Sequence, residues 1–279
     1  MNPLLRGLCP ILLGLLALSA HGQDNTWTEP VTGMVFVALP KNCFQLGTSG
    51  VMAPGGSLGW KRMGFTGSLT ADETPRHEVC LDAFWMARHE VRLSDWQAVM
   101  RQGEGAVERS RPVTGVSWDQ AQAFAARLNE ISGYQQFFRL PTEAQWEYAC
   151  RAGRKEAGEP PLKEVFDMAW FSGTYRTLLE PALVGILKPN AWGLHDLLGN
   201  AWEWVEDGYR ADAYARHDLF NPVTAGEGQQ RVIRGGSYRS EANQMRCGNR
   251  AFYARDDSLP QIGFRLVMTR ASAMGKDAK

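Results

Sequence analysis

An even set of cysteines follows an apolar N-terminal leader, and this combination limits the possible folds more than any other feature of the sequence. The four are Cys43, Cys80, Cys150 and Cys247. An even number of cysteines in an exported chain is typical of a disulfide framework. Four cysteines allow three pairings, and the residues alone do not choose among them. No Cys-x-x-Cys spacing occurs, which argues against a thiolate metal site.

The leader occupies residues 1–22. A positively charged start precedes an apolar run from Leu8 to Leu18, and small residues stand just before Gln23. This order predicts a secretory signal peptide that is cleaved near Gln23. An uncleaved anchor is the alternative, but the run is shorter than the roughly twenty residues that a membrane span needs. We therefore expect an exported domain over residues 23–279, with no membrane span after cleavage.

Composition and charge exclude some classes of partner. The chain has 279 residues, of which 44% are hydrophobic and 22% charged, enough for a substantial core in one domain. Its 30 basic and 30 acidic residues cancel, and no basic run is interleaved with aromatic residues, so we expect no nucleic-acid partner. No Gly-x-Gly-x-x-Gly motif or phosphate loop supports a nucleotide cofactor.

Three helices are predicted from capping boxes, in which a cap hydroxyl and a later amide side chain satisfy free backbone N–H groups. The patterns are Ser94 with Gln97, Ser117 with Gln120, and Thr142 with Gln145. After the second pattern, apolar residues recur at helical spacing up to Gly133, which predicts a helix that faces the core.

Strands are expected to be few and short. Residues 34–39, 231–234 and 263–267 are rich in apolar and β-branched residues and are bounded by turn residues, which predicts strands. Residues 50–73 and 153–190 show neither helical nor strand periodicity. With 29 glycines and 14 prolines, we expect packing and bound ions to order these segments. The sequence therefore predicts an α+β, loop-rich single domain.

Two copies of Arg-His-Glu-Val, at residues 76–79 and 88–91, raise the question of a metal site. They lack the His-Glu-x-x-His spacing that places two imidazoles on one helix face. The alternating pattern after Pro75 favours strands instead, so we expect both copies to be structural. His195 and His217 are isolated in the sequence and carry no prediction of a ligand.

Four short motifs in the second half of the chain carry a family resemblance. They are Gly-Asn-Ala-Trp-Glu-Trp at 199–204, Arg-Gly-Gly-Ser-Tyr at 234–238, Arg-Cys-Gly-Asn-Arg at 246–250, and Gly-Phe-Arg at 263–265. Together they resemble the formylglycine-generating enzyme family, also called sulfatase-modifying factors. The resemblance implies a fold related to the C-type lectin fold and low in regular structure. It also implies disulfides between Cys150 and Cys247 and between Cys43 and Cys80.

The resemblance fails at the residues that define the family's chemistry. In the family's active enzymes, two cysteines bind copper and perform the oxidation. Their places hold Ser240 and Met245 here. Reduced copper prefers thiolates, whereas a hydroxyl is a hard ligand and a thioether a weak one. We therefore expect neither bound copper nor formylglycine generation by the usual route.

A pocket is expected around the Gly-Gly-Ser-Tyr turn. Its predicted catalytic residues are Ser237, Tyr238, Ser240, Glu241 and Trp202. Ser237 and Trp202 match residues near the family's active site, and Glu241 is a candidate general base if it is buried. The alternatives are that the glycine pair marks a purely architectural turn and that Trp202 belongs to the core.

The resemblance also implies a structural calcium ion in the segment 196–203. The family's ligands match Asp196, Gly199, Ala201 and Glu203. Two carboxylates separated by a glycine-containing turn supply the oxygen ligands that a hard cation prefers. The alternative is a turn without an ion.

The overall layout is similar to the exported, periplasmic branch of the family. This similarity implies a role in oxidising a dihydro precursor of a siderophore, the pyoverdine chromophore. The partners would be that precursor or another small peptide substrate, together with other periplasmic maturation enzymes. The alternative is an accessory protein that binds a peptide or glycan in a lectin-like groove without chemistry. A redox enzyme with an unrecognised metal is a third hypothesis.

Overall fold

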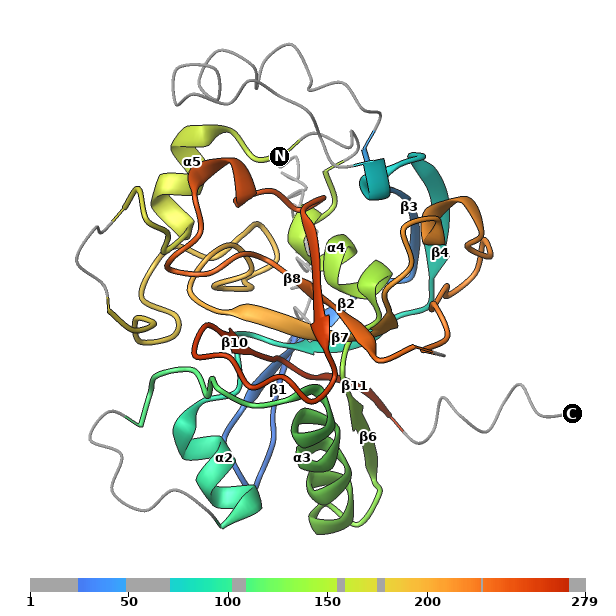
Figure 1. Cartoon of the computed structure of the whole chain (residues 1–279). Coiled ribbons are helices and arrows are strands. Elements are labelled where there is room, and N and C mark those ends of the chain that lie inside the picture. The colour runs from blue at the N-terminus through green and yellow to red at the C-terminus, as the bar shows by residue number, and fades with distance from the viewer. Residues whose placement is uncertain are drawn as a thin grey trace, which may run out of the picture.

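The computed structural model describes residues 25–48, 71–101, 109–154, 159–174, 179–226 and 228–270 (Figure 1). The predicted signal peptide and most of the aperiodic segment 50–73 lie outside these ranges. Within them, no helix combines the length and the hydrophobicity that a membrane span requires.

Three small sheets form the framework of the part of the chain that the structure describes. The first, in the order β1-β2-β5-β11-β6, contains Thr26–Thr28, Val35–Leu39, Phe84–Ala87, Val267–Arg270 and Gln136–Arg139. The second, in the order β10-β7-β8-β9, contains Ile262–Gly263, Trp202–Gly208, Gln230–Arg234 and Arg250–Ala254. The third pairs β3 (Asn42–Leu46) with β4 (His77–Leu81). The pairs are antiparallel except β10 with β7.

Four α-helices of the described ranges flank the sheets. They are α2 (Leu93–Met100), α3 (Trp118–Ile131), α4 (Glu143–Arg151) and α5 (Leu162–Met168), with short 3₁₀ turns η1 (Ala71–Glu73), η2 (Ala213–Ala215) and η3 (Ala242–Gln244). Figure 1 shows α2 and α3 on one side of the strands and α4 and α5 on the other. This mixture of helices, short strands and long loops confirms the predicted α+β, loop-rich fold.

Two of the three predicted capping boxes are present. Ser117 and Thr142 cap α3 and α4, and each side chain accepts from a backbone N–H three residues later. The prediction for Ser94 is wrong, because α2 begins two residues earlier with Arg92 as its cap. There the Asp95 carboxylate accepts from the Arg92 backbone N–H at 2.9 Å and from its guanidinium at 2.7 Å. The ion pair fixes the helix start that the hydroxyl was expected to fix.

Two further predictions need correction. Residues 263–267 do not form one strand: β10 ends at Gly263 and belongs to the second sheet, while β11 begins at Val267 in the first. The residues between them cross from one sheet to the other, and the Phe264 carbonyl accepts from the backbone N–H of Val91. The stretch 153–190 is also not wholly irregular, because it contains α5.

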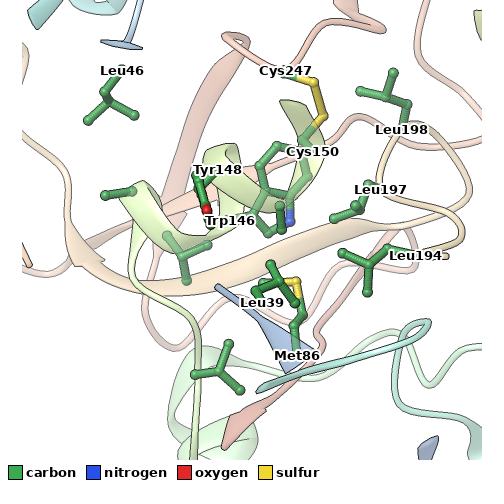
Figure 2. Packing of buried hydrophobic residues seen from close by; sticks show 14 of the residues in the cluster. Leu39, Leu46, Met86, Trp146, Tyr148, Cys150, Leu194, Leu197, Leu198 and Cys247 are labelled. Carbon is green, nitrogen blue, oxygen red and sulfur yellow. A yellow bond between two sulfur atoms is a disulfide. The ribbon is translucent and has the colours of Figure 1, made fainter. Parts of the chain in front are cut away.

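The first sheet is buried on both faces because alternate residues of a strand point to opposite sides. In β2, Val37 and Leu39 join a core around α4, whereas Phe36 joins a core formed with α2 and α3. Trp146 of α4 lies at the centre of the first core, beside a disulfide (Figure 2).

Both disulfides that the resemblance implies are present. Cys43–Cys80 joins the neighbouring strands β3 and β4. Cys150–Cys247 joins the end of α4 to the segment after η3, across 97 residues of sequence. The second bridge therefore holds the C-terminal motifs against the helix that organises the first core (Figure 2).

Candidate functional site

The Gly-Gly-Ser-Tyr turn is tightly closed on itself. Gly235 and Gly236 have φ values of +96° and +81°, a region that side chains rarely adopt. The Ser237 backbone N–H donates to Ser240 Oγ at 3.0 Å, and the two serine hydroxyls lie 3.4 Å apart. Both serines are buried. The turn therefore presents two neutral hydroxyl groups to each other.

Met245 fills the space beside this turn. Its side chain is fully buried in the core around α4. A Cβ atom at Gly236 would overlap the Met245 methyl group, so the thioether packs directly on the glycine pair. The two positions that hold cysteines in the family thus carry a hydrogen-bonded hydroxyl and a packed thioether.

Backbone hydrogen bonds hold Tyr238 and Trp202 near this turn, and the rings of both residues are buried. The Tyr238 N–H donates to the Asn200 carbonyl at 2.9 Å, two residues before Trp202, and the Tyr238 hydroxyl donates to the Leu179 carbonyl at 3.0 Å. Trp202 packs in the core formed with α2 and α3. The backbone therefore holds Tyr238 and Trp202 close to the turn, but both side chains are buried.

Glu241 lies apart from this buried group. Its side chain is exposed, and its backbone N–H donates to Gln244 Oε1 at 3.0 Å, which closes η3. The general-base role was conditional on burial, and that condition is not met.

Four cavities within the described residues are lined by other parts of the chain. One of 290 Å³ borders Cys150, Asp167, Asp196 and Leu197. An open hollow of 490 Å³ is lined by Asp72, Tyr209, Arg250, Phe252 and Tyr253. In that hollow Tyr209 and Phe252 are stacked with ring centroids 3.8 Å apart. Two more, of 210 and 410 Å³, lie beside the loop 216–225. The five predicted catalytic residues line none of these four.

The predicted calcium ligands are only partly brought together. Asp196 begins the loop with a φ of 55° and accepts from the Gly185 N–H at 2.6 Å through Oδ2. Gly199 and Ala201 follow in the loop that leads into β7. Glu203, however, points to Arg265, which donates to both of its carboxylate oxygens at 2.7 Å. Trp146 also donates to Glu203 Oε2 at 2.8 Å.

Glu90 takes the place beside Asp196 that the resemblance gives to Glu203. It is fully buried, accepts from Asn200 Nδ2 at 3.0 Å, and lies within hydrogen-bonding reach of the Asp196 carboxyl. Burial raises the pKa of Asp196 to about 6 and that of Glu90 well above its usual range. We call Glu90, Asp196, Glu203 and Arg265 the acidic cluster. Glu90 was not predicted from the sequence, because the second Arg-His-Glu-Val copy was considered only as a source of a histidine ligand.

A second buried group of charges lies around α4. We call it the arginine–glutamate cluster, and it consists of Glu73, Glu143, Glu147, Glu159, Arg151, Arg234, Arg246 and Arg250. Arg250, which also lines the 490 Å³ hollow, donates to Glu143 at 2.7 and 2.9 Å. The three arginines of the Arg-Gly-Gly-Ser-Tyr and Arg-Cys-Gly-Asn-Arg motifs therefore belong to this cluster.

A histidine pair borders this cluster. His77 Nε2 lies 3.1 Å from His217 Nδ1, although the two residues are 140 positions apart. His77 Nδ1 lies 3.0 Å from the Pro75 carbonyl, and His217 Nε2 lies 3.2 Å from Thr224 Oγ1. Burial lowers the pKa of His217 to about 4. Within the described residues, no group of three metal-ligating side chains is assembled here or elsewhere.

Comparisons with known proteins identify relatives that belong to one family. The sequence profile described as "Sulfatase-modifying factor enzyme 1-like domain" matches residues 35–270. The formylglycine-generating enzyme of Mus musculus is 30% identical over 225 residues, which cover 72% of this chain and 56% of that enzyme. The enzyme of the same name from Streptomyces coelicolor is 35% identical over 173 residues, 56% of this chain and 52% of the relative. The chain thus spans about half the length of these curated relatives.

A solved structure has the same fold. The structure of PvdO from Pseudomonas aeruginosa aligns with a TM-score of 0.72 at 23% identity, over 87% of this chain and 97% of that chain. The chain therefore has the architecture of that protein over nearly its whole length.

Proposed function

Since the chain belongs to the sulfatase-modifying factor family, whose profile spans residues 35–270, we propose that it acts in the periplasm in the oxidative maturation of a secreted siderophore, the pyoverdine chromophore. The proposal rests on a retained family fold in which Ser240 and Met245 stand where the resemblance places the copper-binding cysteines. Ser240 is hydrogen-bonded and Met245 is packed in the core. The chemistry then depends on the substrate and on oxygen and nitrogen groups of the protein.

The reaction proposed is a two-electron oxidation of a dihydro precursor. The precursor loses two electrons and two protons, and dioxygen takes both to become hydrogen peroxide. A catechol-containing substrate is electron-rich, so the protein has only to orient it and to accept a proton. The hydroxyl groups of Ser237 and Ser240 lie in the turn where the family's active enzymes react, which makes them the groups to test first.

The test is turnover of the reduced siderophore precursor by the purified mature protein in air, with metal content controlled. We expect a product that lacks two hydrogen atoms by mass spectrometry, with one peroxide formed for each dioxygen consumed. Turnover should fall in a folded Ser237→Ala variant. Unchanged turnover in Ser237→Ala would remove that residue from the mechanism. The absence of any product, with a deletion strain that accumulates no dihydro precursor, would reject the proposal.

A binding function is the second candidate, and one observation favours it. The aromatic hollow of 490 Å³ exposes parts of Phe252 and Tyr253 beside the stacked Tyr209. Aromatic faces of this kind suit a planar ring or a sugar. Saturable binding of the precursor without product, abolished by Phe252→Ala, would favour an accessory protein over an enzyme.

A further inference from the structure

The 410 Å³ cavity beside the loop 216–225 contains a positive charge without an acidic partner. Arg139, the last residue of β6, lines this cavity and is partly buried. Its Nη1 donates to the Leu140 carbonyl at 2.8 Å, and within the described residues its guanidinium forms no further hydrogen bond and no ion pair. Burial lowers the pKa of Arg139, but a guanidinium keeps its charge at neutral pH. Since a charge removed from water normally has a counter-ion, the remaining donors of Arg139 are available to an anionic ligand.

The acids nearest to Arg139 are held by other groups. The charges of Glu206 and Asp207 act on Arg139, but Glu206 accepts from a glutamine amide of α3 at 2.7 Å and Asp207 accepts from two backbone N–H groups. Asp82, which also lines the cavity, is paired with Lys41 at 2.8 Å. By contrast, each arginine of the two buried charge clusters bonds a carboxylate of the protein. Arg139 therefore differs from them in having no carboxylate of its own.

We propose that this cavity binds an apolar molecule that ends in a carboxylate, and that the guanidinium of Arg139 recognises the carboxylate. The planar fork of an arginine matches the two oxygens of a carboxylate. A volume of 410 Å³ lies within the range of roughly 300–1,000 Å³ that is usual for small-ligand sites. The other lining residues include three apolar side chains and two hydroxyl groups, those of Leu81, Phe84, Val223, Thr142 and Thr269.

The charges around the cavity favour a carboxylate over a dianion. One guanidinium balances one negative charge, and the carboxyl groups of Glu206 and Asp82 line the same cavity. A phosphate dianion would meet repulsion from both of them. The cavity is also accessible, because Val223 at its edge is 51% exposed. A ligand can therefore enter with its carboxylate toward Arg139 and its apolar body against the apolar side chains.

The experiment is calorimetric titration of the mature protein with N-acetyl-phenylalanine, and with its amide as the uncharged matched probe. We expect saturable binding of the acid, and binding of the amide that is at least about tenfold weaker because the charge-assisted hydrogen bonds are lost. Arg139→Gln should bind the acid as weakly as wild type binds the amide. Arg127→Gln is the matched control, because Arg127 is paired with Glu130 at the exposed surface of α3, and it should bind the acid like wild type.

NMR of the labelled Val223 and Thr269 methyl groups locates the ligand in wild type, so the test does not depend on the folding of a variant. Phenylacetate separates two sources of the carboxylate. If it binds as well as N-acetyl-phenylalanine does, a free acid is sufficient; if it binds far more weakly, the ligand is the carboxyl end of a peptide.

Three results would overturn the proposal. The first is equal binding of the acid and the amide, which would leave the guanidinium without a role. The second is unchanged binding of the acid by a folded Arg139→Gln variant, and the third is a wild-type protein whose Val223 and Thr269 methyl signals do not respond to the acid. None of these measurements involves oxidation or the serine turn, so they are independent of the proposed function.

Discussion

The two buried charge clusters differ in how their charges are balanced. In the arginine–glutamate cluster, four arginines face four glutamates, and Arg234 alone bridges Glu143 and Glu147. In the acidic cluster, Arg265 satisfies Glu203 while Glu90 and Asp196 keep unsatisfied oxygens. A network whose charges are balanced fixes the fold, whereas one with a net charge needs a partner. Charge balance thus separates a structural cluster from a candidate binding site.

The largest loss of stability is expected from a substitution of Arg234. Replacing it with methionine leaves Glu143 and Glu147, both fully buried, without their shared cation. We expect a loss of about 5 kcal/mol in the free energy of unfolding, the upper range for a broken buried pair. Urea denaturation measures the loss. Arg127→Met is the control, because its pair with Glu130 is exposed and should cost less than about 0.5 kcal/mol. Similar losses for both variants would contradict the structural role of the cluster.

The disulfide beside this cluster gives the next largest effect. Cys150–Cys247 closes 97 residues, and the Cys247 carbonyl accepts from Arg234. Replacing both cysteines with alanine should cost about 4.7 kcal/mol on the chain-entropy model. The same change at Cys43 and Cys80, which close 37 residues, should cost about 1 kcal/mol less because loop entropy grows with the logarithm of length. Equal losses in chemical denaturation would argue against loop closure as the main contribution.

Some elements of this fold could be predicted from the sequence, and others could not. Local signals worked where partners are three residues apart, as at Ser117 and Thr142. They failed at α2, where Arg92 and Asp95, also three residues apart, cap the helix in place of the predicted Ser94 and Gln97. The prediction of one strand over 263–267 failed because this segment passes from the second sheet to the first.

The candidate site was less predictable than the fold. Glu90 bonds Asn200 across 110 residues, and Arg250 bonds Glu143 across 107. Periodicity and capping rules contain no information about such pairs. The family motifs located the turn at Ser237 and the loop at Asp196, but not which carboxylate turns toward Arg265. That choice depends on tertiary packing around Trp146 and Glu203.

Asp207 gives a further test of the comparison. It is a buried acid beside the arginine–glutamate cluster, and among the described residues it forms no ion pair with an arginine. It accepts from the backbone N–H groups of Glu143 at 2.6 Å and Thr224 at 2.7 Å. Burial, with the nearby Glu143 charge, raises its pKa to about 7. The folded state therefore keeps this proton to a higher pH than the unfolded state, whose aspartates titrate near about 3.9.

Stability should consequently fall as the pH rises through this window. Between about pH 4 and pH 7, the contribution of Asp207 should decrease by about 3 kcal/mol. The measurement is the free energy of unfolding of wild type minus that of Asp207→Asn at each pH. A difference that stays constant across the window would show that the carboxyl has an ordinary pKa in the folded protein.

His217 gives the smallest effect and the opposite slope. Burial lowers its pKa to about 4, so the unfolded state binds a proton at a higher pH than the folded state does. Acidification from about pH 6.5 to pH 4 should then destabilise the protein through this residue, by about 1–2 kcal/mol after allowance for its partial exposure. Because Asp207 stabilises the protein over the same acidic range, the two slopes partly cancel in wild type. The stability of a His217→Gln variant minus that of wild type should therefore be larger at pH 4 than at pH 7. If the two proteins instead keep a fixed difference at both pH values, burial does not lower the pKa of His217.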